Sequence, residues 1–231
     1  MQAFLNILKH NWIKYGFETV VVTVGILGAF TLESWKDNRQ EDKELLVIYG
    51  TIADDLHSDS LSLVSYLEDY ESRLKNMQRI LTEEVSKEEW IENDSLYFSF
   101  TGFSDFRAST RGLDLLKTNI TTGGEAGILA GQISQFYNTK LLRNDVTLRE
   151  LNDILFHNVK HWMDNEAWLS SSLIDRDRTL LAEYVVDNPY FRNRVATYMV
   201  LFANYYRSLK EYQEEGAELA EEINAFLEEE Q

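Results

Sequence analysis

The pattern of apolar and polar residues begins with one continuous apolar stretch near the start of the chain. Residues 15–32 read Tyr-Gly-Phe-Glu-Thr-Val-Val-Val-Thr-Val-Gly-Ile-Leu-Gly-Ala-Phe-Thr-Leu, with Glu18 as the single charge. Eighteen helical residues span about 27 Å, close to the roughly 30 Å hydrocarbon core of a bilayer. The stretch is bracketed by aromatic residues typical of a membrane interface: Trp12, Tyr15 and Trp35. We therefore predict a transmembrane helix over residues 15–35.

A buried core helix and a cleaved signal peptide are also compatible with this stretch. The signal peptide is disfavoured because Gly28-Ala29-Phe30-Thr31 is a poor small-x-small cleavage site. Residues 1–14 carry enough apolar side chains for a short interfacial helix in contact with lipid. Basic residues flank the span almost equally on both sides. Because short leading tails usually stay cytoplasmic, we expect residues 36–231 outside the inner membrane.

Two later segments show apolar residues at alternating steps of three and four. The first seam has one irregular step, through Ser60, and comprises Leu45, Tyr49, Ile52, Leu56, Leu63, Leu67, Tyr70, Leu74, Met77 and Leu81. The second is regular and comprises Phe191, Val195, Tyr198, Phe202, Tyr205, Leu209, Tyr212, Gly216, Leu219, Ile223 and Phe226. Such seams predict facing helices. The fold class expected for residues 36–231 is all-α, an antiparallel helical bundle with long coiled-coil-like helices.

The region between the two seams is expected to hold shorter helices. A bend is expected near Gly50 or His57–Ser60, and aromatic-rich connections interrupt residues 86–124. We predict helices over 104–118, 125–138 and 139–182, the last with an apolar side of Leu141, Leu148, Leu151, Leu155, Val159, Trp162 and Met163. A turn with a Thr cap is expected at Thr121-Thr122-Gly123-Gly124. Asp187-Asn188-Pro189 predicts an N-cap followed by proline at the first helical position.

Composition narrows the classes of function. The 231 residues carry a net charge of −17, which argues against sequence-independent binding to nucleic acid, and the absence of Cys excludes thiol chemistry. Residues 1–35 balance two basic residues against two acidic ones, so the excess lies outside the predicted span. Residues 211–231 hold nine Glu and no Lys or Arg. This acidic end is expected to be a solvated helix end, and a docking site for a basic protein partner or for cations is the alternative.

Within the span, a polar residue and small residues suggest helix association. Gly25 and Ala29 form a small-x-x-x-small pair with Gly28 beside them, which permits close approach of a second helix. Glu18 lies about one turn inside the span, where it either reaches the headgroups or faces a sister helix. The sequence therefore predicts a homo-oligomer with Glu18, Gly25, Gly28 and Ala29 at its membrane interface. A ring of Glu18 lining an ion path is the alternative.

The same span resembles an uncharacterised family of bacterial single-span membrane proteins. The shared pattern is Glu18, then Gly25-Ile26-Leu27-x-Ala29, then Trp35; in that family the span opens with Tyr-x-x-Gly-Glu and closes with Asn-x-Trp-Asn. This chain departs from the family at Phe17 and at Glu33-Ser34-Trp35-Lys36. A weaker echo is Ser109-Thr110-Arg111-Gly112-Leu113-x-Leu115-Leu116 followed by Ile133-x-x-Phe136-Tyr137. The resemblance implies topology and carries no activity.

Few residues form a chemical constellation. Asp153, His157 and His161 share a helical face, with Asp164 a turn further, and such spacing can chelate a metal. The Glu of a zincin motif is missing, so an ordinary solvated surface is the favoured interpretation of this pair, and a metal site and a pH-sensitive patch are the alternatives. No Ser-His-Asp frame or dinucleotide fingerprint occurs, so we predict no catalytic residue, no cofactor and no enzyme activity. The function expected is a membrane-anchored interaction, sensor or scaffold protein; an oligomeric channel and a receptor built around His157 and His161 are the alternatives.

Overall fold

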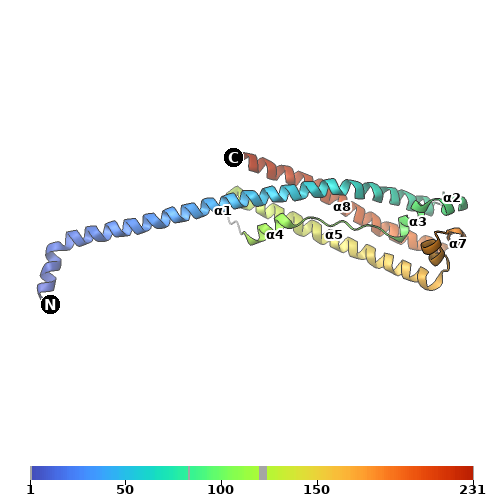
Figure 1. Cartoon of the computed structure of the whole chain (residues 1–231), viewed down its shortest axis with the longest axis horizontal. Helices are drawn as coiled ribbons and strands as arrows, with labels where there is room; N and C mark the ends of the chain where they lie inside the picture. Colours follow the sequence, from blue (N-terminus) through green and yellow to red (C-terminus); the bar gives the residue numbers. More distant parts are fainter. Residues whose placement is uncertain (1, 83, 120–123, 231) are drawn as a thin grey trace. The chain divides into compact units, whose positions relative to one another are not determined.

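The computed structural model describes residues 2–82, 84–119 and 124–230, and within these it leaves the side chains of residues 2–15, 37, 38 and 42 undescribed. Every regular element in the described ranges is helical, which confirms the all-α prediction. The elements, in order, are α1 (Gln2–Leu81), α2 (Lys87–Glu92), α3 (Asp94–Thr101), α4 (Arg111–Thr118), α5 (Gly124–Asn165), α6 (Trp168–Ser170), the π-helix η1 (Ser171–Asp175), α7 (Thr179–Tyr184) and α8 (Pro189–Glu229) (Figure 1). The chain divides into two units, Met1–Ile48 and Tyr49–Gln231.

In the second unit, α8 runs antiparallel to the part of α1 that begins at Tyr49. The ring of Tyr49 packs edge-on against Phe226 at 5.6 Å, whereas further along α1 Tyr70 packs against Phe202 at 4.9 Å. At the opposite end from Tyr49, Arg192 donates a hydrogen bond to the Leu81 carbonyl at 2.8 Å. The two predicted seams therefore face each other, and every residue of the second seam is buried except Phe226, which is half-buried.

Helix α5 lies along α8 as well, also antiparallel (Figure 1). The Lys140 ammonium on α5 is ion-paired with Glu215, and nearer the C-terminal end of α5 the Arg194 guanidinium donates to Asn158 at 3.1 Å. Because α5 is one helix from Gly124 to Asn165, the predicted break near residue 138 is wrong. The predicted apolar side is also partly wrong, since Met163 is 64% exposed. Of the turn predicted before α5, residues 121–123 lie outside the described ranges.

The connection over residues 102–110 is not helical, so the predicted helix over 104–118 shortens to α4. In this connection, backbone groups form hydrogen bonds with side chains of the long helices instead of helical hydrogen bonds. The Tyr70 hydroxyl donates to the Ser104 carbonyl, and the Phe106 N–H donates to the Tyr205 hydroxyl at 3.1 Å. Buried backbone groups need such partners, and the aromatic seams supply them.

Local signals at the helix ends behave as predicted at one site and not at another. The Asn188 side chain accepts a hydrogen bond from the Phe191 N–H at 3.0 Å and Pro189 is the first residue of α8, which confirms the cap. In contrast, α1 continues through Gly50 and His57–Ser60 without the expected break. One glycine in a helix costs only about 1 kcal/mol, which packing of the surrounding turns offsets.

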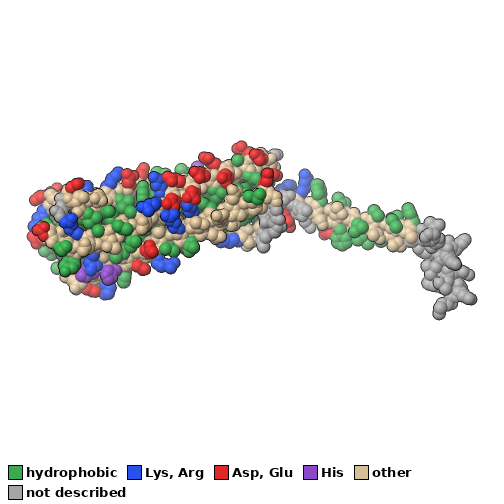
Figure 2. All heavy atoms as spheres, turned by 180° about the vertical axis from the view of Figure 1, so that it is seen from behind, with side chains coloured by type: hydrophobic (Ala, Val, Ile, Leu, Met, Phe, Trp, Pro, Cys, Tyr) green, Lys and Arg blue, Asp and Glu red, His purple; other side chains and the backbone are tan. Residues whose placement is uncertain are grey.

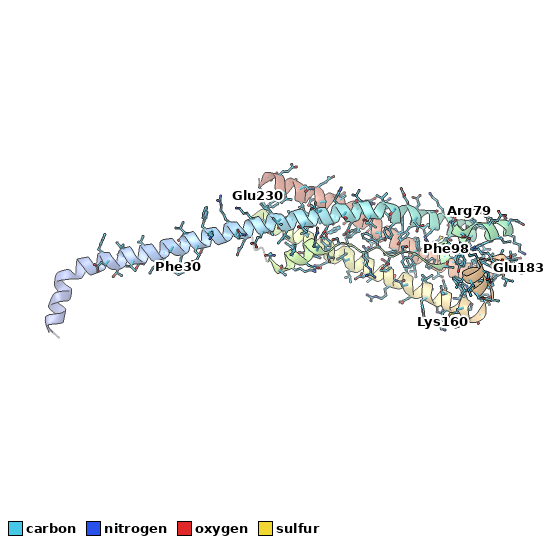
Figure 3. All side chains as sticks on the ribbon, viewed as in Figure 1. Phe30, Arg79, Phe98, Lys160, Glu183 and Glu230 are labelled. Atoms are coloured by element: carbon cyan, nitrogen blue, oxygen red, sulfur yellow. The ribbon has the colours of Figure 1, made fainter. Side chains whose placement is uncertain are left out.

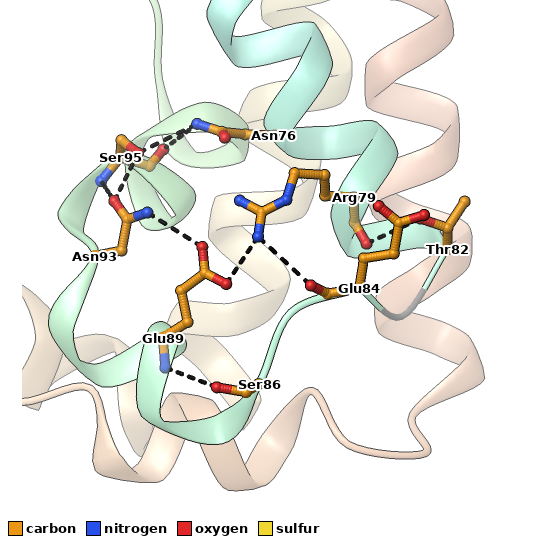
Figure 4. Close-up of polar contacts among 8 residues, drawn as sticks. All are labelled: Asn76, Arg79, Thr82, Glu84, Ser86, Glu89, Asn93 and Ser95. Atoms are coloured by element: carbon orange, nitrogen blue, oxygen red, sulfur yellow. Dashed lines mark hydrogen bonds and ion pairs between the residues drawn. The ribbon is translucent and has the colours of Figure 1, made fainter.

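A polar cluster fastens the C-terminal end of α1 to the two short helices that follow it (Figure 4). Arg79 is ion-paired with Glu89 at 2.8 Å, and the other oxygen of that carboxylate accepts from Asn93 at 3.4 Å. The side chain of Ser86 caps α2, and Asn93 ends α2 while its side chain caps α3. These contacts close the chain back on itself after α1, so that α3 and the connection to α4 return along the long helices.

Candidate functional site

The segment predicted to cross a membrane, residues 15–35, is exposed wherever its side chains are described, over residues 16–35. One helix of the described residues, near the start of the chain, is long and apolar enough to be a candidate span, and none of its most apolar window is buried. The large apolar side chains that it exposes are Phe17, Val20, Val21, Val22, Val24, Ile26, Leu27, Phe30, Leu32 and Trp35 (Figures 2 and 3). Burying one such side chain is worth about 1.5–3 kcal/mol, so an apolar environment would stabilise this segment. The alternative of a buried core helix does not fit it.

The polar groups of this segment are satisfied within the helix or lie near its ends. The Thr23 hydroxyl donates to the Thr19 carbonyl and the Thr31 hydroxyl to the Leu27 carbonyl, each at 2.8 Å. Self-contained hydroxyl bonds of this kind are suited to a medium without water. At the far end, the Arg39 guanidinium lies 4.8 Å from the centre of the Trp35 ring.

The residues proposed for helix association share one side of this helix. At 100° per residue, Glu18, Gly25 and Ala29 lie within an arc of about 40°, and Gly28 lies about 60° from Gly25. A Cβ added at Gly25 or Gly28 would meet no atom within 4 Å. The face is therefore open, as a contact surface between copies requires. The side chains of Trp12 and Tyr15, the other predicted interface anchors, lie outside the described part of the chain.

The structure does not gather the candidate metal ligands into a site. Asp153 and His157 are exposed on α5, and His161 is half-buried with its Nδ1 atom 3.4 Å from the Asn165 side-chain amide. The carboxylate of Asp164 is ion-paired with Lys160 at 2.8 Å. Among the residues with described side chains, no three His, Asp or Glu lie together as metal ligands. The geometry gives the receptor alternative no support.

A buried carboxylate pair that sequence reasoning missed lies on α1, against the N-terminus of α4. Asp55 is 4% exposed; one oxygen accepts from the Gly112 N–H at 2.8 Å, and the other from Arg111 at 3.2 Å. Asp59 is 5% exposed and accepts from the Ser109 N–H at 3.0 Å and from the Tyr212 hydroxyl at 2.7 Å. Both carboxylates are engaged in this way, so the pair holds the backbone before and at the start of α4 against α1.

Gly112 is what lets α4 approach α1 this closely. A Cβ at Gly112 would lie 2.5 Å from the Ile52 side chain and 2.8 Å from the Ile52 backbone nitrogen. The only irregularity in the sequence near the carboxylate pair is the step at Ser60, and Asp59 is the buried residue beside it. A charged residue next to a seam is normally solvated, so the pattern alone gave no reason to place Asp59 inside.

Several residues of the weaker sequence echo lie at this network. Backbone N–H groups of Ser109 and Gly112 hold the two carboxylates, and the ring of Phe136 lies 5.4 Å from that of Tyr212. Tyr137 is fully buried beside them, and burial together with the two carboxylates raises the pKa of its hydroxyl. The echo, scattered over positions 109 to 137, thus contributes backbone donors and aromatic rings to this network, whereas Leu115 is exposed.

The carboxylate of Asp59 predicts a pH dependence of stability. Burial raises the pKa of Asp59, opposed by the hydrogen bonds from Tyr212 and the Ser109 N–H and reinforced by the charge of Asp55. Because the folded pKa exceeds the unfolded one, the contribution of Asp59 is fully present below about pH 4 and is lost as the pH rises through the folded pKa. Asp59→Asn removes this titration. Urea unfolding at pH 4 and pH 7 should therefore show the wild type gaining stability relative to Asp59→Asn at the lower pH; an unchanged difference contradicts the shift.

The acidic end of the chain is partly neutralised from within. Glu211 is ion-paired with Arg143, and Glu215 with the buried Lys140, both from α5. The remaining glutamates of residues 218–230 are exposed on α8 (Figure 2). Part of the run thus balances the charge of α5, and only the rest is available to a basic partner.

Comparison of the chain with models of known protein families, with curated proteins and with solved structures found no match. The arrangement of the described residues therefore defines the class on its own: an all-α chain with one candidate span and an acidic helical unit.

Proposed function

We propose that this chain is a single-pass, membrane-anchored interaction or scaffold protein that self-associates and performs no catalysis. One observation carries the proposal: a helical segment of about one bilayer thickness exposes ten large apolar side chains and buries none of its most apolar window. The hydrocarbon chains of a lipid bilayer would bury that apolar surface. In this proposal residues 15–35 cross the inner membrane, residues 1–14 lie at its interface with the N-terminus in the cytoplasm, and residues 36–231 form an antiparallel helical bundle outside it.

The experiment that tests the anchor is membrane fractionation of the full-length protein. The protein should sediment with membranes, resist an alkaline wash and be released by detergent. A reporter fused to Gln231 should be active on the extracytoplasmic side. Recovery of the protein in the wash supernatant would show that the apolar segment is covered by something other than lipid. A reporter active in the cytoplasm would reverse the proposed orientation.

Self-association is proposed to use the face of Gly25 and Ala29. Replacing both by Leu fills an open surface without straining the chain, because a Cβ at Gly25 meets nothing within 4 Å. The variant should therefore keep its membrane location and lose association by at least about tenfold, equivalent to 1.4 kcal/mol, in a detergent sedimentation experiment.

The control introduces leucine at two positions away from this face, Val20→Leu with Phe30→Leu, and should associate as the wild type does. An unchanged oligomer in the Gly25 and Ala29 variant would rule out this interface. Glu18→Gln distinguishes the two roles considered for this glutamate. If the protein is only an anchor, the variant should at most associate more weakly. If the protein is a channel, the variant should lose ion flux in liposomes.

A further inference from the structure

Exposed apolar side chains gather around a groove where α5 ends and α6 and η1 follow. Met163 is 64% exposed, Leu173 62% and Ile174 79%, and Phe156 lies exposed on the preceding turns of α5. The groove has a volume of about 550 Å³. Its apolar walls are Val159, Met163, Ala167, Leu169, Leu173 and Ile174. Figure 3 marks this end of the unit by Lys160, on the last turns of α5.

A fixed turn presents the outermost apolar pair, Leu173 and Ile174. Ser172, which precedes the pair, is buried, and its hydroxyl donates to the Asp177 carbonyl at 3.3 Å. The Asp177 N–H donates back to the Ser171 carbonyl at 3.2 Å, and Arg176 closes the turn with a φ of 56°. Because these hydrogen bonds fix the backbone of the π-helical turn, they also fix the exposed positions of Leu173 and Ile174. Short π-helical turns often occur at functional sites.

Trp168 and Leu169 anchor the floor beneath this turn. Both are buried, and the Trp168 ring packs 5.5 Å from Trp162 of α5 and 5.7 Å from Tyr184 of α7. The groove therefore lies on a packed aromatic base. A preformed wall of this kind lowers the entropy cost of binding.

The charged residues around the groove favour a positively charged binding partner. The two charged residues that line it, Asp164 and Glu166, are both acidic. Asp175 adds a third carboxylate at the end of η1, whereas the neighbouring cations are Lys160, which is paired with Asp164, and Arg176. At this acidic rim, the soluble part of a second copy or an anionic lipid surface would meet repulsion, since the whole chain carries −17.

We propose that this groove binds an amphipathic helix of a partner protein, one with an apolar stripe flanked by Lys and Arg. The inference rests on the proposed role as an interaction protein and names the chemistry of its partner. An apolar stripe at i, i+3, i+4 and i+7 fits a groove between helices, and the flexible Met163 adapts to its side chains. Lys and Arg at its edges pair with Glu166 and Asp175.

The test uses full-length protein in phosphatidylcholine nanodiscs and a fluorescent synthetic helix with Leu at i, i+3, i+4 and i+7 and Lys on its flanks. A twin peptide carries Glu in place of Lys. The groove variant is Leu173→Ser with Ile174→Ser, and the matched control is Leu142→Ser with Val200→Ser, two exposed positions outside the groove lining. The Lys peptide should bind wild type and control alike and bind the groove variant at least about tenfold more weakly; the Glu twin should bind wild type weakly.

Three results would overturn the proposal. Equal binding of the Lys peptide to the groove variant would mean general attraction to an acidic protein, and equal binding of both peptides would remove the charge selection. Binding of anionic vesicles, but no peptide, by wild type would make the groove a membrane contact. Because all variants keep residues 15–35, each is expected to fractionate with membranes. A membrane-bound protein that ignores the peptide overturns only the groove, whereas a soluble wild type overturns the anchor.

Discussion

Arginine at Val24 and Leu27 should release the protein from the membrane fraction. Both side chains lie in the middle of the apolar segment and are exposed, at 63% and 60%. An arginine near the centre of a span costs about 2.5–3.5 kcal/mol on insertion, so the pair costs on the order of 6 kcal/mol. Fractionation of the Val24→Arg, Leu27→Arg variant should find most of the protein outside the membrane pellet.

The matched control carries the same two charges on exposed polar positions of the second unit, Ser58→Arg with Ser62→Arg. It should remain with the membrane. Retention of the Val24 and Leu27 variant in membranes after the alkaline wash would mean that residues 15–35 are not the anchor.

Replacing Gly112 by alanine should disrupt the packing of α4 against α1 and destabilise the second unit. The added Cβ would lie 2.5 Å from the Ile52 side chain, 2.8 Å from its backbone nitrogen and 2.9 Å from its Cα atom. Backbone atoms cannot move away by rotating about a side-chain bond, so the two helices must separate. This separation weakens the 2.8 Å hydrogen bond from the Gly112 N–H to Asp55. Overpacking of this kind costs about 3 kcal/mol. For a unit of this size, thermal unfolding followed by circular dichroism should show a midpoint lower by on the order of 10 °C.

Gly131→Ala is the control for this substitution. Gly131 is exposed on α5, and an added Cβ meets nothing within 4 Å. Alanine there should stabilise α5 by about 0.5–1 kcal/mol, because it improves helix propensity without a clash. A Gly112→Ala variant as stable as wild type would show that α4 does not pack on Ile52 in this way.

The two heptad seams illustrate how far sequence reasoning reached. The seam from Phe191 to Phe226 was regular, and its positions are the buried face of α8. The seam on α1 broke its rhythm at Ser60, and there the prediction failed in detail: the helix continues unbroken, and Asp59 enters the core. A periodic pattern reports which face is apolar, but it cannot report which polar residue has a buried partner, because that partner is distant in sequence.

The middle of the chain shows the same limit. Residues 104–110 have a composition compatible with a helix, yet the hydroxyls of Tyr70 and Tyr205 hold their backbone in a non-helical connection. Likewise, Met163 fits an apolar stripe in the sequence but is exposed in the wall of the groove. In both places a tertiary contact, or its absence, outweighed local preference.

By itself the sequence determined the helical class, the apolar segment over residues 15–35, the two facing seams and the cap at Asn188, because each depends on the spacing of neighbours along a helix. Only the tertiary structure decided that Asp55 and Asp59 are buried, that Gly112 touches Ile52 and that Leu173 and Ile174 are exposed in the wall of a groove. Those features depend on which surfaces meet between segments that are distant in the chain, and the free energy of such contacts is not encoded in any local pattern.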